Sequence, residues 1–391
     1  MLGVVLAAFG GTLVVGEVWG PLVGAWLNAR RYRHAVERRP TVPPERVLLA
    51  CPCKGAEPRL EANARRLLEQ DHPDYAVVFV TESDTDAAVP ILERLLVAYP
   101  HGRRLVSGRA RTTTQKIHNI LGAWTSADPA TVLASVDADM TVPDVGWLRR
   151  LVRPLGWKDV AVTTAFFQVP VSDHDPVAHL CAAIVRSFEM WVAGLSGWVF
   201  GGTFALRRDT FENLGGPQVW DEALAEDIWL SVACAEARLR VLAVPDAWST
   251  NEPIRRLPGL WVWATRQTQA NKYMALFPVL TVLASLLGAA SLLPLLLLGS
   301  LGDPRWLGPG LIGLFAALVA IGGHALWLCW PQTTAPRQRL SPGVLVVPAL
   351  FPMAALAMLH AALSRRLLWA GIRYDLGPRS TVRRVVFPDA G

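Results

Sequence analysis

Residues 131–139 read Thr-Val-Leu-Ala-Ser-Val-Asp-Ala-Asp, an apolar run that ends in two carboxylates. A short, continuous apolar run of this kind predicts a strand that is buried on both faces. Asp137 and Asp139 follow at its carboxyl end, and they point to one side because side chains alternate along an extended chain. Such a pair can share a divalent cation with a diphosphate, although an Asp-x-Asp triplet alone is a common pattern.

Similar runs on either side of this stretch alternate with segments of helical periodicity. Strands are predicted at 47–52, 75–81, 105–106, 160–168 and 201–206, and helices at 58–70, 89–97, 115–124, 176–191 and 224–237. This alternation predicts an α/β domain with a mostly parallel sheet covered by helices. Such sheets bind ligands at the carboxyl ends of their strands, where Asp84 also falls. A glycine pair before 203–206 lets another group approach the backbone closely.

Long apolar runs flank the α/β domain. With 391 residues, 52% of them hydrophobic, the chain suits one sizeable domain plus a membrane portion. The runs at 1–27, 274–301, 306–330 and 343–363 are each long enough to cross a hydrocarbon core of roughly 30 Å. Five arginines at 30–39 follow the first run, which predicts an uncleaved anchor whose carboxyl side is cytosolic.

The end of the chain raises a question of topology. Three crossings after the domain would place an arginine-rich tail outside, against the positive-inside rule. We therefore expect the run 343–363, which Pro348 and Pro352 interrupt, to be re-entrant or interfacial, with 364–374 along the interface beside Trp369. The predicted organisation is an anchor at 1–28, an α/β domain at 29–257, an interfacial helix at 258–273, transmembrane or re-entrant segments at 274–364 and a basic interfacial tail at 365–391.

Charge and cysteine content narrow the classes of partner. The net charge is +6, and the basic clusters lie beside apolar runs, which favours anionic lipid headgroups over nucleic acid. Five cysteines do not form a disulfide framework, and Cys51-Pro52-Cys53 has no second pair at metal-site spacing. Reduced cytosolic thiols are the simpler interpretation.

Several polar residues have both a structural and a functional interpretation. Asp84 can serve a turn, and Lys116 can be a solvated charge or a phosphate ligand. Glu226 and Asp227 lie in the first turn of a predicted helix, where the helix dipole alone favours carboxylates. The segment 258–273 suits an interfacial helix with aromatic and basic anchors, whose residues can also reach a diphosphate.

Taken together, these motifs resemble the inverting family 2 glycosyltransferases, most closely the ceramide glucosyltransferase-like branch with its bacterial lipid-glycosylating relatives. The matching segments are 53–58, 70–75, the region of Asp84, 116–119, 137–139, Gly202, 207–209, 215–216, 225–227, Trp263 and 369–374. The resemblance covers nearly the whole chain. It implies a GT-A fold, a nucleotide-activated sugar, usually a uridine diphosphate sugar, and Mg²⁺ or Mn²⁺ as cofactor.

The resemblance also implies roles for individual residues. Asp227 would be the general base, and Asp137 and Asp139 would serve the nucleotide and the metal. Asp84 would contact the uracil or ribose. Further candidates for contacts with the nucleotide sugar are Lys54, Glu57, Lys116, Glu226, Trp263, Arg266 and Gln267.

The chain departs from the family pattern just before the second apolar run. The family's Gln/Arg-x-x-Arg-Trp signature would end at Trp263, but Gly259 and Val262 stand where polar residues belong. Arg266 and Gln267 are candidates to replace them, and so are Gln269 and the pair 272–273.

We therefore expect an enzyme of the cell inner membrane with its α/β domain in the cytosol. It would move one sugar, with inversion, from a nucleotide donor to the hydroxyl of a lipid such as ceramide, a hopanoid or diacylglycerol. A processive polysaccharide synthase is the first alternative, and it predicts more membrane helices and an intact signature. A membrane transport or scaffold protein with a vestigial nucleotide pocket is the alternative without catalysis.

Overall fold

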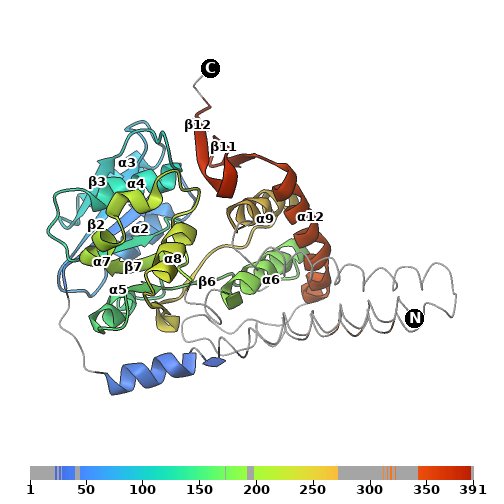
Figure 1. Ribbon diagram of the computed structural model, residues 1–391, viewed down its shortest axis with the longest axis horizontal. Coiled ribbons are helices and arrows are strands. Elements are labelled where there is room, and N and C mark those ends of the chain that lie inside the picture. The colour runs from blue at the N-terminus through green and yellow to red at the C-terminus, as the bar shows by residue number, and fades with distance from the viewer. Residues whose placement is uncertain are drawn as a thin grey trace.

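The computed structural model describes residues 29–39, 45–171, 173–191, 198–271 and 342–388, with a few single residues between 23 and 27 and between 311 and 322. The α/β domain, on the left in Figure 1, is built around a seven-stranded sheet in the order β3-β2-β1-β4-β7-β5-β8. Its strands are β1 (Val47–Pro52), β2 (Tyr75–Thr81), β3 (Gly102–Val106), β4 (Val132–Val136), β5 (Val162–Thr164), β7 (Thr203–Arg207) and β8 (Val241–Ala243). Only β7 runs against its neighbours, so the sheet is mostly parallel, as the sequence predicted.

Helices cover both faces of this sheet because its strands are apolar on both sides. One face packs against α2 (Leu60–Leu68), α3 (Val89–Leu96) and α5 (Trp147–Val152). The other packs against α4 (Gln115–Trp124), α7 (Arg208–Asn213) and α8 (Glu226–Glu236). The alternation of strand residues between the two cores explains this arrangement, since Leu49 belongs to the first core and Leu48 to the second.

Most predicted elements have the expected place, and β1, β2 and α4 also have the expected bounds. The predicted strand at 160–168 is in fact two strands, because the chain leaves the central sheet after β5. The second piece, β6 (Phe167–Gln168), pairs in parallel with β9 (Ser249–Thr250) in a separate two-stranded sheet.

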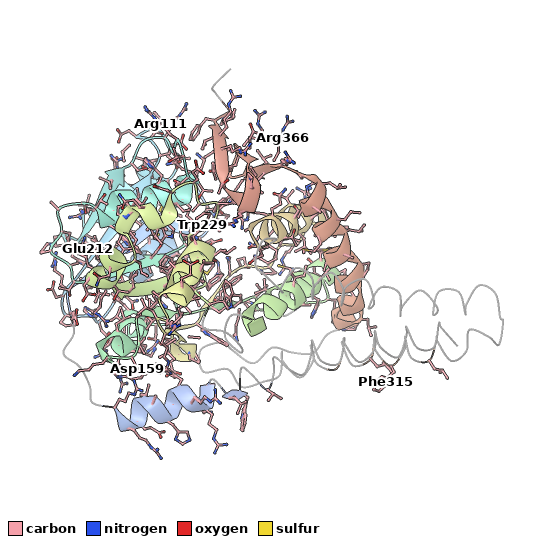
Figure 2. All side chains as sticks on the ribbon, viewed as in Figure 1. Arg111, Asp159, Glu212, Trp229, Phe315 and Arg366 are labelled. Carbon is pink, nitrogen blue, oxygen red and sulfur yellow. The ribbon has the colours of Figure 1, made fainter. Side chains whose placement is uncertain are left out.

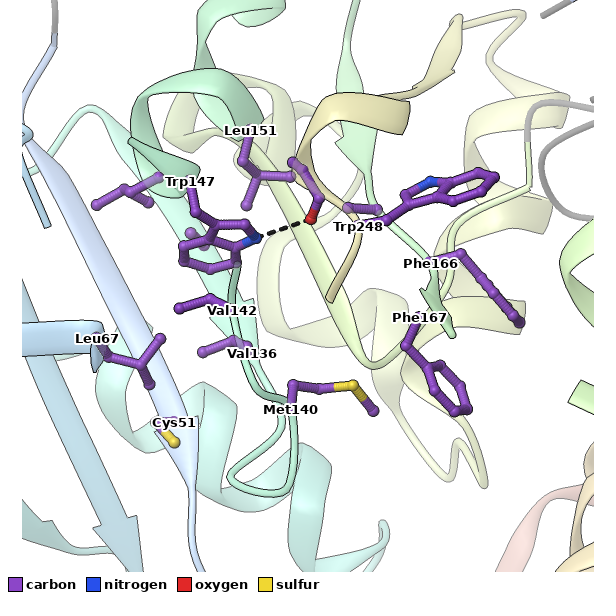
Figure 3. Close-up of a cluster of buried hydrophobic side chains, with 14 of the residues drawn as sticks. Cys51, Leu67, Val136, Met140, Val142, Trp147, Leu151, Phe166, Phe167 and Trp248 are labelled. Carbon is purple, nitrogen blue, oxygen red and sulfur yellow. Dashed lines mark hydrogen bonds between the residues drawn. The ribbon is translucent and has the colours of Figure 1, made fainter. Parts of the chain in front are cut away.

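Val136, the last residue of β4, belongs to a cluster of buried hydrophobic side chains (Figure 3). The indole Nε1 of Trp147 donates a hydrogen bond to the carbonyl of Ala247 at 2.9 Å, which joins α5 to the segment before β9. Met140 is buried in the same cluster, and its sulfur accepts a hydrogen bond from the hydroxyl of Ser249 at 3.3 Å. Packed side chains of this cluster therefore support the turn that follows β4.

Three helices lie together beside the sheet domain (Figure 1). They are α6 (Pro176–Trp191), α9 (Leu257–Asn271) and α12 (Leu350–Leu363), and a 3₁₀ segment, η6 (Pro342–Ala349), precedes α12. The predicted interfacial helix at 258–273 therefore corresponds to α9, while residues 272–273 lie outside the described part of the chain.

The predicted membrane runs fall largely outside the described residues. Nearly all of 1–27 and of 306–330, and the whole of 274–301, belong to that undescribed part. Within the described residues, no helix combines the length and the hydropathy that a membrane crossing requires. The run 343–363 is divided between η6 and the 14 residues of α12.

The tail after α12 folds into three antiparallel strands that the sequence did not predict. These are β10 (Arg366–Trp369), β11 (Ile372–Leu376) and β12 (Val382–Val386). Their inner face packs with Leu224, next to the start of α8, and with Ala270 of α9. Figure 2 shows Arg366 on this small sheet, where its side chain is exposed. The strands were hard to predict because each of them contains at least one exposed arginine.

Candidate functional site

The turn after β4 carries the two carboxylates of the Asp-x-Asp triplet. The amide of Asp137 donates a hydrogen bond to the carbonyl of Gly202 at 3.0 Å, which extends the pairing of β4 with β7. The side-chain amide of Asn63, on α2, donates to the carbonyl of Ala138 at 3.0 Å. Both sides of the turn are thus fixed by elements of the sheet domain.

Asp139 has a neighbour that the sequence did not single out. The side-chain amide of Asn251 donates a hydrogen bond to Oδ2 of Asp139 at 3.0 Å. Loss of hydration and the nearby charge of Asp137 raise the pKa of Asp139 to about 6, although the bond from Asn251 acts in the opposite direction. Asn251 directly follows β9, so only the tertiary fold brings it to the triplet.

Lys116, near the start of α4, connects the triplet to α8. Its ammonium nitrogen lies 2.7 Å from an oxygen of Asp137 and 2.7 Å from Oε1 of Glu226. It also donates to the carbonyl of Gly201 at 3.1 Å. Burial alone would lower the pKa of Lys116, but the two carboxylates raise it above its ordinary value. The side chain is therefore a charged link within the protein, not a solvated surface group.

Glu226 and Asp227 are adjacent in the first turn of α8 but have different surroundings. Glu226 is buried, and burial raises its pKa to about 7, with further contributions from Asp227 and Asp137 against the opposing effect of Lys116. Asp227 is partly exposed, and its carboxylate accepts hydrogen bonds from the amides of Gly201 at 2.9 Å and Ile228 at 2.8 Å. Burial raises the pKa of Asp227 despite these bonds.

Gly201 allows the backbone to approach both carboxylates of α8. A Cβ atom at this position would lie 2.3 Å from Oε1 of Glu226 and 3.0 Å from Oδ2 of Asp227. The sequence predicted a close approach at the glycine pair, and the approaching group proves to be the start of α8.

Arg266 of α9 faces the same negative charges. Loss of hydration lowers the pKa of Arg266, while the charges of all four carboxylates act in the opposite direction. Those four residues are Asp137, Asp139, Glu226 and Asp227. No hydrogen bond or salt bridge joins the guanidinium to the described residues, and it lies over the ring of Trp369 at 4.7 Å from the centroid. Within the described part of the chain, the donor groups of Arg266 are therefore not engaged.

The other candidates in the region before the second apolar run lie differently. Gln269 is buried, and its amide donates to the carbonyl of Arg366 at 3.0 Å, so it holds the tail. Trp263 packs against the larger core. The backbone carbonyl of Gln267 accepts a hydrogen bond from Asn271 within α9.

A second group of candidates lies at the ends of β1 and β2. Lys54 forms a 2.7 Å ion pair with the largely buried Glu82. Asp84 is 72% exposed and pairs with Arg104 at 2.7 Å. Glu57 is exposed at the surface before α2. The structure therefore brings six candidates into one charged cluster: Lys116, Asp137, Asp139, Glu226, Asp227 and Arg266. It leaves Asp84 and Glu57 at the solvent-exposed surface.

The residues present suit a metal ion that is shared with a ligand. Among the residues described, no group of three or more His, Cys, Asp or Glu side chains could hold an ion. Asp137 and Asp139 nevertheless offer hard carboxylate oxygens, and loss of hydration together with the charge of Asp137 raises the pKa of Asp139. Mg²⁺ in phosphate sites is typically bound by one or two carboxylates plus the substrate phosphates. The pair therefore fits a divalent cation that binds together with a diphosphate.

The domain has a GT-A-like α/β fold, with a mostly parallel sheet and a carboxylate cluster at the ends of its strands. The family model "Glycosyl transferase family 21" matches residues 13–382, and the chain belongs to this family. The expected resemblance to ceramide glucosyltransferases is confirmed by this match together with a curated relative.

The curated relative is a ceramide glucosyltransferase of Komagataella phaffii. It is 34% identical over 62 residues, which cover 15% of this chain and 12% of the relative. The match therefore spans about an eighth of that protein's length.

Two solved structures are similar to parts of this chain. The mannosyltransferase PcManGT from Pyrobaculum calidifontis, in complex with GDP-Man and Mn²⁺, aligns with a TM-score of 0.53 and 19% identity over 90% of this chain and 99% of its own. Glucosyl-3-phosphoglycerate synthase from Mycobacterium tuberculosis, in complex with Mn²⁺ and UDP-Glc, aligns with a TM-score of 0.38 and 15% identity over 58% of this chain and 77% of its own. At these identities, the first supports the fold alone.

Proposed function

We propose that this chain is an inverting, membrane-bound glycosyltransferase that moves one sugar from a nucleotide donor, a uridine diphosphate sugar, to a lipid hydroxyl. The observation that carries the proposal is the charged cluster itself. Asp137 and Asp139 lie on the turn after β4, whereas Asp227 projects from the first turn of a different element, α8. Inverting transfer needs this separation, because the base and the leaving group act on opposite faces of the sugar.

Asp227 is the proposed general base. Its pKa is raised, so its carboxylate is a stronger base than an ordinary aspartate. The amides of Gly201 and Ile228 orient the carboxylate while leaving it lone pairs for a substrate hydroxyl. The base would take the hydroxyl proton as the oxygen attacks the anomeric carbon, while the bond from that carbon to the diphosphate breaks and the nucleoside diphosphate leaves.

Asp137 and Asp139 are the proposed ligands of Mg²⁺ or Mn²⁺, which when bound would neutralise charge on the diphosphate. Lys116 forms ion pairs with both Asp137 and Glu226. These contacts support a role for Lys116 and Glu226 in orienting the triplet. Arg266 would donate to the diphosphate oxygens and would take the place of the polar residues that the signature lacks. Contacts of Asp84, Lys54 and Glu57 with the nucleotide remain predictions.

A lipid acceptor is supported by the surface beside the cluster. Apolar side chains on α9, η6 and α12 are each more than half exposed: Leu257, Val262, Leu345, Leu356, Leu359 and Leu363. An exposed apolar surface of this kind is typical of contact with a membrane or a protein partner. Because α9 also carries Arg266, a bilayer against this surface would present lipid headgroups close to the carboxylates.

Comparing lipids by mass spectrometry, from cells with and without the protein, tests the proposed function. A lipid that gains one hexose mass only when the protein is present is the expected result, and long polymers would favour the processive alternative. In purified form, the variant Asp227→Asn should lose transfer and still bind the donor. Glu236→Gln, at the exposed end of the same helix, is the matched control.

Full transfer by Asp227→Asn would refute the assigned base. Absence of both transfer and hydrolysis with all common nucleotide sugars would instead favour the non-catalytic alternative. The anomeric configuration of the product, followed by NMR, tests inversion separately.

A further inference from the structure

The β10–β11 hairpin brings an aromatic ring from the tail to the charged cluster. Its two-residue turn, Ala370-Gly371, has φ values of 50° and 78°. Left-handed backbone at both turn positions is the geometry of a tight hairpin that matches the twist of its strands. Trp369 is paired with Ile372 at the closed end of this hairpin.

The ring of Trp369 packs on the guanidinium of Arg266. The Cζ atom of Arg266 lies 4.7 Å from the ring centroid, which is within the range of a cation–π contact. Burial lowers the pKa of Arg266, whereas the charges of the carboxylates in the cluster, such as Asp137 and Asp139, act to raise it. The guanidinium thus contacts the indole ring and also experiences the negative charge of the carboxylates.

Three hydrogen bonds fix the tail strands to separate parts of the protein. The amide of Gln115, at the start of α4, donates to the hydroxyl of Tyr374 at 3.2 Å. The amide of Val382 donates to the carbonyl of Glu222 at 2.7 Å. With the bond from Gln269 to the backbone of β10, these contacts attach the tail to α4, to α9 and to the segment before α8. The indole is consequently fixed relative to the cluster.

We propose that Trp369 is a positioning residue that directs the Arg266 guanidinium toward the diphosphate of the donor, so that the C-terminal strands complete the donor site. This inference rests on the proposed function in nucleotide-sugar transfer. It assigns a role to the tail segment 369–374, and it explains how the chain functions with Gly259 and Val262 in the pre-membrane signature. Arg266 alone would have many rotamers, and stacking on a fixed ring removes most of them before the donor binds.

The test uses the full chain in lipid nanodiscs and measures the dissociation constants of UDP, GDP and uridine by calorimetry with Mn²⁺ present. Arg266→Ala should weaken diphosphate binding at least about tenfold, because a charge-assisted contact is lost. Trp369→Leu should weaken it in the same direction, and Trp369→Phe should restore part of the affinity because Phe keeps an aromatic face. Leu368→Ala is the matched control, since Leu368 is adjacent on β10 and 62% exposed.

The double variant Arg266→Ala/Trp369→Leu decides whether the two residues act together. A positioning role predicts that it binds UDP no more weakly than Arg266→Ala alone, while uridine binding stays unchanged in every variant. Multiplicative losses, or an equal loss of uridine binding in Trp369→Leu, would overturn the inference and leave the proposed function standing. A wild-type protein that binds neither UDP nor GDP would overturn the proposed donor chemistry and this inference together.

Discussion

The ammonium group of Lys116 lies 2.7 Å from Oε1 of Glu226, and this contact joins α4 to α8 across the carboxyl end of the sheet. The same nitrogen contacts Asp137, so one buried cation orients two carboxylates from different elements. A buried carboxylate that loses its partner is strongly destabilising, because its charge is no longer compensated. The two ion pairs of Lys116 therefore contribute both to the stability of the fold and to the geometry of the triplet.

Replacing the cation should affect stability as well as binding. Lys116→Met leaves Glu226 uncompensated, and we expect a loss of about 3 kcal/mol in the free energy of unfolding, measured by denaturant titration. Adding Glu226→Gln should recover part of that loss, since the neutral amide needs no cation. Lys158→Met, at an exposed position, is the control. Equal stability of Lys116→Met and wild type would show that the ion pair does not contribute as inferred.

Gly201 offers a test of the close approach between the segment before β7 and the start of α8. Gly201→Ala should displace both carboxylates, because its Cβ would lie 2.3 Å from Oε1 of Glu226. We expect transfer to fall by roughly 100-fold, in line with the effect of a displacement of about 1 Å at a reacting centre. Gly259→Ala, whose Cβ would meet Ile254 at an ordinary 3.4 Å, should retain activity.

The two glycine variants are compared by their transfer rates and by their midpoints of thermal unfolding. A Gly201→Ala protein as active as Gly259→Ala would contradict the inferred contact. Equal loss in both would instead indicate that these glycines matter only for folding.

The sequence predicted the centre of the sheet well and the edges of the molecule poorly. The runs at 47–52 and 75–81 are continuous and apolar because both faces of β1 and β2 are buried, so their pattern is unambiguous. The strand β8 has only three residues, and each tail strand carries exposed arginines, so neither gives a periodic signal. Short edge elements depend on tertiary packing, which no local pattern records.

The charged residues of the candidate site were predicted from the sequence, but the contacts that Asn251 and Trp369 make with them were not. Asp137, Asp139 and Asp227 stand at predicted element ends, where chemistry is expected. Asn251 and Trp369 meet the cluster only through the β6–β9 pairing and the tail hairpin. Contacts between segments so distant in sequence follow from the fold, and spacing along the chain does not reveal them.

The metal is tested by removal and replacement. Chelation with EDTA should abolish transfer, and Mn²⁺ or Mg²⁺ should restore it, because the carboxylate pair would bind the cation together with the diphosphate. Asp139→Asn should raise the Mn²⁺ concentration needed for half-maximal activity at least about tenfold, since one anionic ligand is lost. Asp221→Asn, at the exposed end of a 3₁₀ segment, is the control. Undiminished transfer in EDTA would exclude a required divalent ion.

The packing of the tail on the α/β domain predicts on which side of a membrane the tail lies. Tyr374 and Gln115 are joined by a hydrogen bond, so the tail strands and the domain must share one compartment. This agrees with the expectation that the run 343–363 does not complete a crossing, and it predicts that the tail arginines lie on the same side of the membrane as the domain.

Cysteine labelling in sealed, right-side-out vesicles measures this arrangement. The cysteines at 51, 53, 181 and 234 are buried, so a background with Cys329→Ala should be inert to a membrane-impermeant maleimide. Arg384→Cys in the tail and Val97→Cys in the domain, both exposed, should stay unlabelled until the membrane is permeabilised. Because the two positions belong to one packed unit, both should be labelled or both should be protected in any one preparation. Labelling of the tail position alone in sealed vesicles would contradict the docking of the strands, and labelling of both would reverse the proposed orientation while leaving the docking intact.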